Sequence, residues 1–298
     1  MAQADIAFIG FGEAAEAFAT GWGQAAGQVR AYDLKCDDPA AVALPRMRAG
    51  RCDVALADNR AAALGGAGVV FCLVTADCAE RAATEAAPHL APGALWFDGN
   101  SCSPGAKRRA AAVIEGAGGR YVDLAIMAPV HPKLHRTPLL IAGPHTAQAG
   151  AALDALDMPY GVAGGQVGDA SSIKMIRSVM IKGMEALSAE CLLAARRAGV
   201  DGAVLASLQA SNPDIDWPRQ AAYNLERMMV HGRRRAAEMR EVAATLTELG
   251  LPDAMARATV DWQQRIGDMK MSAGEDSFAT RADMVLGAFG GMGKPEAG

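Results

Sequence analysis

Residues 6–25 read IAFIGFGEAAEAFATGWGQA, and they indicate the fold of the first half of the chain. It starts with a short apolar run, IAFI, that is typical of a buried strand. It continues over 13–25 as an alanine-rich segment that predicts a helix. A GxGxxA pattern joins the two, which indicates a Rossmann dinucleotide-binding domain. The predicted cofactor-binding residues of this loop are Gly10, Phe11, Gly12, Glu13, Ala14 and Ala15.

The small residues of this loop suit a bound dinucleotide. Gly10 permits the tight turn, Gly12 lets the backbone approach a pyrophosphate, and Ala15 allows the helix to pack closely on the strand. The next strand, VRAYD, ends in Asp33, where a carboxylate binds ribose hydroxyls. Its charge repels a 2′-phosphate and favours NAD, whereas Lys35 leaves NADP as the alternative.

The rest of the first half repeats the alternation of strand and helix. Apolar runs at VVFCLV, ALWFD and RYVDL alternate with helical segments over 77–90 and 104–117. This predicts a parallel sheet with crossover helices. TPLLIAG at 137–143, followed by a helical segment near 146–156, predicts extra strands on the same sheet. We therefore expect an α/β fold, with a doubly wound parallel sheet in a dinucleotide-binding domain over residues 1–165.

The pattern changes after the glycine-rich segment VAGGQVGDA at 162–170. No period-two run follows it, and helix signals continue to the end of the chain. We predict an all-α substrate and dimerisation domain over 166–298. Its predicted helices cover 169–198, 201–209, 217–249, 253–267 and 277–288.

The predicted sheet also places further residues near the cofactor. In a doubly wound sheet the ligand lies across the carboxyl ends of the strands. The residues that follow VVFC and ALWFD are therefore predicted to face the cofactor. They are Leu73, Val74, Thr75, Asn100 and Ser101.

Composition excludes several classes of function. A net charge of −4 over 298 residues gives no basic field for nucleic acid. The apolar runs are shorter than the roughly 20 residues that span a bilayer, so no membrane segment is expected. The six cysteines show no CxxC or Cys/His spacing, so no metal site is expected. The start MAQADIAFIG has no basic leader, and we expect a cytoplasmic protein.

Two further motifs resemble a known enzyme family. DGNSCSP at 98–104 is similar to the turn D-x-S-[ST]-x-x-P, with Asn100 at its first serine. GDASSIK at 168–174 is similar to G-x-G-x-x-x-K, with Ala170 in place of the second glycine. Together with the N-terminal pattern, they resemble the β-hydroxyacid dehydrogenases, the family of 3-hydroxyisobutyrate and 6-phosphogluconate dehydrogenases. The C-terminal half looks closest to a subgroup whose C-terminal domain is of unknown function.

The resemblance implies that Lys174 is the catalytic lysine. Its place in the sequence supports this, because it lies in the first turns of a predicted long helix beside the glycine-rich hinge. A helix N-terminus and a dry cleft both disfavour an ammonium and lower its pKa toward a value suited to proton transfer. We expect Lys174 to accept the hydroxyl proton as hydride moves to the nicotinamide, and to donate it in reduction.

The chain departs from the family's substrate-binding pattern. The family has Ser-Gly-Gly after the strand at 121–126, whereas this chain has Met127, Ala128 and Pro129, and proline has no N–H to donate. Where the family has asparagine four residues after the lysine, this chain has Ser178, preceded by Arg177. We expect these five residues to line a rebuilt substrate site.

A later helix carries the third departure. The family's Lys-Asp pair aligns with His231 and Gly232, so His231 is expected near the nicotinamide. His231, Arg234, Arg235 and Glu238 share one face of the helix 217–249. A guanidinium binds a carboxylate or phosphoryl group through two hydrogen bonds. We therefore expect an arginine, Arg177 or one on this face such as Arg234, to anchor an anionic substrate.

These observations predict an NAD(P)-dependent dehydrogenase or reductase that acts on a CH–OH group. The substrate is a β-hydroxyacid or a related compound, and Met127 favours a bulkier one. An idle dinucleotide-binding or interaction module is the alternative from another class, which the Met127–Pro129 segment keeps open. An imine reductase shares the architecture, but such relatives typically lack the lysine at position 174.

The long helix 169–198 also predicts a homodimer. This helix looks exposed in an apolar, all-helical second half, which suggests a buried dimer surface, and the resemblance implies pairing through the C-terminal helices. Met175, Met180 and Met184 recur at near-helical spacing and are predicted to lie in the core.

Overall fold

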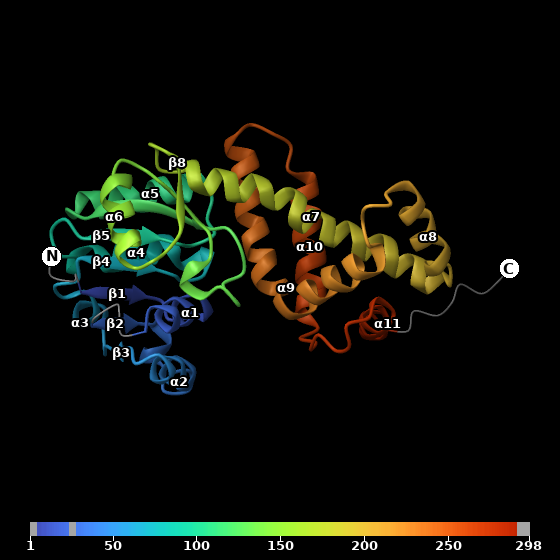
Figure 1. Ribbon diagram of the computed structural model, residues 1–298, viewed down its shortest axis with the longest axis horizontal. Helices are drawn as coiled ribbons and strands as arrows, with labels where there is room; N and C mark the ends of the chain where they lie inside the picture. Colours follow the sequence, from blue (N-terminus) through green and yellow to red (C-terminus); the bar gives the residue numbers. More distant parts are fainter. Residues whose placement is uncertain (1–4, 24–27, 291–298) are drawn as a thin grey trace. The chain divides into compact units, whose positions relative to one another are not determined.

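Eight strands form one sheet in the first of the two units into which the chain divides, Met1–Met175 and Ile176–Gly298 (Figure 1). The computed structural model describes residues 5–23 and 28–290, and the strand count refers to these. The strands are β1 (Ile6–Ile9), β2 (Val29–Tyr32), β3 (Ala55–Leu56), β4 (Val69–Cys72), β5 (Leu95–Asp98), β6 (Arg120–Ile126), β7 (Leu139–Ala142) and β8 (Tyr160–Gly164).

The sheet is mostly parallel. Its order is β3-β2-β1-β4-β5-β6-β7-β8, and β7 runs antiparallel to β6 while β8 runs parallel to β7. The predicted α/β sheet is confirmed, with this one reversal at β7. The connection from β6 to β7 contains only a short 3-10 turn, Leu134–Arg136, and antiparallel neighbours need no crossover helix.

Alternate side chains of the central strands enter two separate cores. Phe8 and Phe71 face one side of the sheet, whereas Ala7, Val70 and Trp96 face the other. The first side is covered by α1 (Glu13–Trp22), α2 (Ala43–Arg51) and α6 (Thr146–Ala155). The second side is covered by α3 (Arg60–Leu64), α4 (Ala79–Ala86) and α5 (Pro104–Gly116). This is the doubly wound arrangement that the sequence predicts, and α1 occupies the predicted segment up to residue 22; residues 24 and 25 lie outside the described part of the chain.

The second unit is helical in its described part, as predicted. Helix α7 (Asp169–Ala198) starts in the first unit and continues into the second. It is followed by α8 (Asp201–Ser211), α9 (Trp217–Glu248), α10 (Ala254–Asp268) and α11 (Phe278–Ala288). These bounds agree with the predicted helices to within two residues. The first unit extends past the predicted domain boundary at 165 and takes in Lys174.

Packing in the second unit depends on a close helix crossing. Helices α9 and α10 meet at Gly232 and Gly267, where a side chain on either residue would overlap the other helix's backbone. Met175 is buried, as predicted, but Met180 is 64% exposed, so the prediction that it lies in the core is wrong. It is not part of the apolar cluster of the second unit, to which α7 contributes the later residues Leu192 and Leu193. Among the described residues, no helix is both long and apolar enough to cross a membrane.

Candidate functional site

The turn after β1 needs glycine at its first position. Gly10 has φ +86°, and a Cβ there would lie 2.6 Å from the carbonyl oxygen of Leu73. Leu73 follows β4, the strand next to β1, so the loop passes directly over the carboxyl end of β4. Since an L side chain fits neither the dihedral angle nor the space, this position accepts only glycine.

Gly12 faces open space instead. A Cβ at Gly12 would meet only the Arg48 Nη1 atom, at 4.0 Å, and the residue caps α1 without a side-chain hydrogen bond. The first turn of α1 therefore presents its backbone to a ligand, which is the arrangement that binds a pyrophosphate. Glu13 is exposed and Ala15 is buried against the sheet core. The dinucleotide loop thus fits the cofactor that the sequence predicts.

Asp33 is held beside this loop. Its Oδ2 atom accepts a hydrogen bond from the Phe11 N–H at 2.8 Å, and its Oδ1 atom accepts one from the Lys35 N–H at 3.0 Å. The carboxylate is therefore fixed at the carboxyl end of β2, while the Lys35 side chain is exposed. A fixed negative charge here can accept bonds from ribose hydroxyls and repels a 2′-phosphate.

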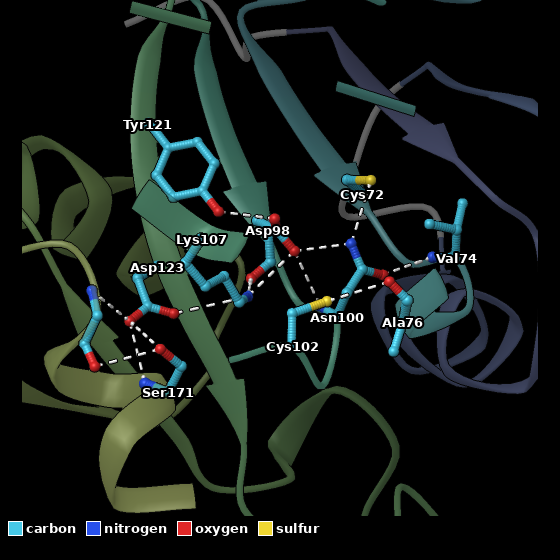
Figure 2. A network of polar contacts seen from close by, with 11 residues as sticks. Cys72, Val74, Ala76, Asp98, Asn100, Cys102, Lys107, Tyr121, Asp123 and Ser171 are labelled. Atoms are coloured by element: carbon cyan, nitrogen blue, oxygen red, sulfur yellow. Dashed lines mark hydrogen bonds and ion pairs between the residues drawn. The ribbon is translucent and has the colours of Figure 1, made fainter. Parts of the chain in front are cut away.

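The residues predicted after β4 and β5 lie together. The Val74 N–H donates to Asn100 Oδ1 at 2.7 Å, which joins the two loops (Figure 2). Thr75 is exposed, whereas Leu73, Val74 and Ser101 are partly buried and Asn100 is fully buried. Buried Asn100 therefore holds the loop after β4 in place at the carboxyl end of the sheet. The backbone around Val74 lies at the surface of this edge.

A set of buried polar residues lies under this edge and was not predicted from the sequence. Asp98, Tyr121 and Asp123 are strand residues whose side chains lie on the side of α5, and Lys107 of α5 reaches between them (Figure 2). Lys107 Nζ lies 3.1 Å from Asp98 Oδ1 and 3.5 Å from Asp123 Oδ1. Charged residues inside otherwise apolar strands were the available signal.

Lys174 lies in the second turn of α7 and is partly buried. The start of that helix is held by Asp123, because its Oδ2 atom accepts from the Ser171 N–H at 3.0 Å and from the Ser171 hydroxyl at 3.1 Å. The position of the proposed catalytic lysine is thus set by β6 of the sheet.

The segment after β6 offers few donors, as expected. The Met127 N–H donates to the Pro138 carbonyl at 3.0 Å, and Pro129 has no N–H. Met127 and Ala128 are partly exposed and Pro129 is exposed. Of the three residues, only Ala128 therefore has a backbone N–H that is able to donate a hydrogen bond to a substrate carboxylate.

The second unit brings Ser178 and Arg234 into one polar group. Ser178 is buried, and its hydroxyl accepts from Lys182 Nζ at 3.2 Å. Lys182 pairs with Glu238 at 3.0 Å, and Arg234 lies 3.6 Å from the same carboxylate. Arg177, by contrast, is exposed on α7.

His231 and Arg234 both line a hollow of about 400 Å³ on the surface of the second unit. Arg233 and Lys270 also line it, so the hollow is basic, although Arg233 is paired with Asp268 at 2.7 Å. Arg235 points elsewhere: it is buried and pairs with Glu185, which removes it as an anion clamp. Among the described residues, no group of three His, Cys, Asp or Glu side chains is placed to hold a metal ion.

Comparisons with known proteins agree with this geometry. Residues 5–157 match the NAD binding domain of 6-phosphogluconate dehydrogenase, and residues 195–266 match a domain of unknown function, DUF1932. No curated protein is a significant match. The chain belongs to the family defined by the 6-phosphogluconate dehydrogenase NAD binding domain, and it carries an NAD(P)-binding domain. More particularly, it belongs to the β-hydroxyacid dehydrogenase-like group with the C-terminal DUF1932 domain.

Solved structures extend the likeness over the whole chain. A conserved hypothetical protein from Sinorhizobium meliloti 1021 is 40% identical, with 96% of this chain and 97% of that chain covered and a TM-score of 0.73. MTH1747, a conserved protein of unknown function described as structurally similar to 3-hydroxyacid dehydrogenases, is 31% identical over 89% and 97%, with a TM-score of 0.67. The 3-hydroxyisobutyrate dehydrogenase of Mycobacterium tuberculosis shares the fold at 16% identity over 95% and 99%, with a TM-score of 0.72.

Proposed function

We propose that the protein is a nicotinamide-dependent oxidoreductase that interconverts a hydroxyl and a carbonyl group. Its substrate is a β-hydroxyacid or a related, bulkier compound, and Lys174 is the general acid and base. The observation that carries the proposal is the placement of Lys174 in the unit that holds the dinucleotide loop, on a helix start tied to β6 by Asp123. A lysine so fixed can act on a substrate proton with little reorganisation.

The loop residues and Asp33 bind the cofactor, and Lys174 transfers the proton. Gly10 and Gly12 leave room for the pyrophosphate, and Asp33 binds the ribose, which favours NAD over NADP. The bound cofactor supplies the hydride acceptor in oxidation and the donor in reduction. In oxidation, neutral Lys174 takes the substrate hydroxyl proton on Nζ; in reduction, the ammonium returns it to the carbonyl oxygen.

The substrate is proposed to be anionic. Arg177 is exposed one turn after Lys174, and Arg234 borders the basic hollow of the second unit. Either guanidinium can bind a carboxylate or phosphoryl group through two hydrogen bonds, whereas the Met127–Pro129 backbone leaves only the Ala128 N–H for it. Met127, partly exposed beside that backbone, favours a substrate with an apolar portion.

A second candidate, an idle dinucleotide-binding module, is favoured by the Met127–Pro129 segment alone, since it lacks the usual carboxylate donors. Following the absorbance of reduced cofactor against hydroxyacids, aldehydes, ketones and imines separates the two. Turnover of hydroxyl or carbonyl compounds supports the dehydrogenase. Cofactor binding without turnover of any of them supports the idle module, and turnover of imines alone supports an imine reductase.

We further propose a homodimer that forms through the second unit. Ile176, Met180, Ile181 and Leu187 of α7 are exposed although they are large and apolar. Such a row is costly in water and is typical of a protein interface. Light scattering on the parent and on Met180→Asp tests this, with a dimer expected for the parent and a monomer for the variant; a monomeric parent contradicts it.

The six free cysteines fit a reducing compartment such as the cytoplasm.

A further inference from the structure

An ammonium group and two carboxylates are buried together beneath α5 (Figure 2). The Lys107 side chain is fully buried and donates to the Asp98 carbonyl oxygen at 2.6 Å and to Asp98 Oδ1 at 3.1 Å. Asp123 Oδ1 lies 3.5 Å from the same nitrogen. None of these three groups gives or takes the proton in the transfer assigned to Lys174.

Packing alone does not account for a charge at this position. Burial lowers the pKa of Lys107, but the charges of Asp98 and Asp123 oppose it and raise the pKa overall, so the side chain is an ammonium. Buried ion pairs can often be replaced by apolar residues without loss of stability. The rest of α5 faces the sheet with apolar residues such as Ala110 and Ile114. The contacts of Asp98 and Asp123 indicate a role for this charge other than stability.

One arm of the network leads to the predicted cofactor edge. Asp98 Oδ1 accepts from the Asn100 backbone N–H at 3.0 Å and from its side-chain amide at 2.7 Å. Asp98 Oδ2 accepts from the Tyr121 hydroxyl at 2.7 Å. These bonds fix which way the Asn100 amide points, so that its Oδ1 atom accepts from the Val74 N–H. The Asp98 carboxylate thereby sets the loops after β4 and β5.

The other arm leads to the helix that carries Lys174. Asp123 Oδ2 accepts from the Gly168 N–H at 3.1 Å and from both the N–H and the hydroxyl of Ser171. Asp123 is thus the N-terminal cap of α7, supplied by a neighbouring strand. Its other oxygen, Oδ1, is buried without a hydrogen bond and faces the Lys107 ammonium. The carboxylate that positions this helix therefore has Lys107 as its counter-charge.

We propose that Lys107 is a positioning residue that holds the cofactor edge and the start of α7 in register through Asp98 and Asp123. This inference rests on the function proposed above, because it gives Lys107 a role only if the cofactor edge and Lys174 work together. Without the ammonium, two carboxylates remain close together in a region of low dielectric. One of them then takes up a proton or moves, and the bonds that it accepts are rearranged.

The test uses Lys107→Met, which keeps the length of the side chain and removes the charge, with exposed Lys133→Met as the matched control. The first readout is the affinity for NADH, measured by its fluorescence. The second is the titration curve of Lys174, followed by NMR on isotope-labelled dimethyl groups and assigned with Lys174→Arg. We expect Lys107→Met to weaken NADH binding about tenfold, to shift the Lys174 curve and, where a substrate turns over, to lower kcat by up to about 100-fold. Lys133→Met should leave all three unchanged.

Single-arm variants keep the proposal testable even if Lys107→Met does not fold. Asp98→Asn is expected to weaken NADH binding with little effect on the Lys174 curve, and Asp123→Asn to shift that curve with little effect on NADH. Tyr121→Phe should act like Asp98→Asn but less strongly. A folded Lys107→Met with parental NADH affinity and a parental Lys174 curve overturns the proposal, as do single-arm variants that change neither readout. Neither the NADH affinity nor the Lys174 titration curve requires turnover. A failure of the positioning role can therefore be distinguished from a failure of the proposed reaction.

Discussion

The backbone N–H of Phe11 donates a 2.8 Å hydrogen bond to Asp33 Oδ2, which ties the acid at the end of β2 to the loop after β1. The carboxylate is thus oriented before any cofactor binds. Preorganisation of this kind makes a fixed charge effective in selecting a ligand, since no rearrangement is needed on binding.

Replacing this acid should change the choice of cofactor. Asp33→Ser removes the charge that repels a 2′-phosphate, and Lys35 next to it can then attract one. We expect NAD to bind about tenfold more weakly and NADP more tightly, measured as dissociation constants by fluorescence titration. Asp38→Asn, an exposed acid in the same segment, is the control. A parent that already prefers NADP would contradict the assignment.

Alanine substitutions of the two loop glycines, Gly10 and Gly12, should affect different properties, stability in the first and cofactor affinity in the second. Gly12→Ala places a methyl group in open space, so the fold should lose little stability. Cofactor affinity should fall, because this is the position at which the Rossmann loop needs close approach to the pyrophosphate. Gly10→Ala should unfold more easily, by about 1–3 kcal/mol, because of its positive φ and the overlap with Leu73. Thermal melts and cofactor titrations of both variants check this. Equal loss of stability in the two would contradict the geometry.

Substitutions of the two neighbouring arginines of α9, Arg234 and Arg235, should have different effects on stability. Arg235→Ala removes the positive charge that pairs with buried Glu185 and leaves that carboxylate only the hydrogen bond from the Gln263 amide, so we expect a loss of about 3–5 kcal/mol in the free energy of unfolding. Arg234 is 53% exposed, and Arg234→Ala should leave stability within about 0.5 kcal/mol of the parent. Arg234→Ala and Arg177→Ala are the variants that should raise KM for anionic substrates. Unchanged KM in both would remove the arginine anchor.

Stability should fall in acid partly through His135. Burial lowers the pKa of this histidine below its usual 6.5, although Asp157 nearby opposes the shift. The folded state therefore favours the neutral ring, so its contribution to stability is complete above pH 6.5 and is lost as the pH falls through the lower pKa. We expect His135→Gln to lose less stability than the parent between about pH 8 and pH 5, measured by urea unfolding. Parallel curves for the two proteins would contradict this.

Much of the fold could be predicted because its signals are local. The GxGxxA loop and the helix 169–198 are fixed by glycine placement and by helical periodicity, which are readable in short windows. Strand β8 was not identified as such, since YGVAG is short, rich in glycine and only partly buried. The antiparallel direction of β7 was also not predicted, because direction depends on how the chain returns to the sheet.

The candidate site was predictable only where a loop motif marks it. Lys174 and Asp33 follow recognisable patterns, whereas Lys107 looks like an ordinary surface lysine of an alanine-rich helix. It becomes significant only when folding places it against Asp98 and Asp123, which are 9 and 16 residues away in the chain. Likewise, Arg235 resembles its exposed neighbours in sequence, and only the packing of α9 against α7 distinguishes it.

The role of Lys174 as general acid and base is tested by the rate of hydride transfer in Lys174→Ala beside Lys133→Ala, each mixed with NAD and a hydroxyacid that the parent oxidises. Loss of the general base should lower the rate of NADH formation by about 100-fold or more in Lys174→Ala, while NAD affinity stays near that of the parent. Lys133→Ala should match the parent throughout. A Lys174→Ala variant that forms NADH as fast as the parent would contradict the role of Lys174 as general base.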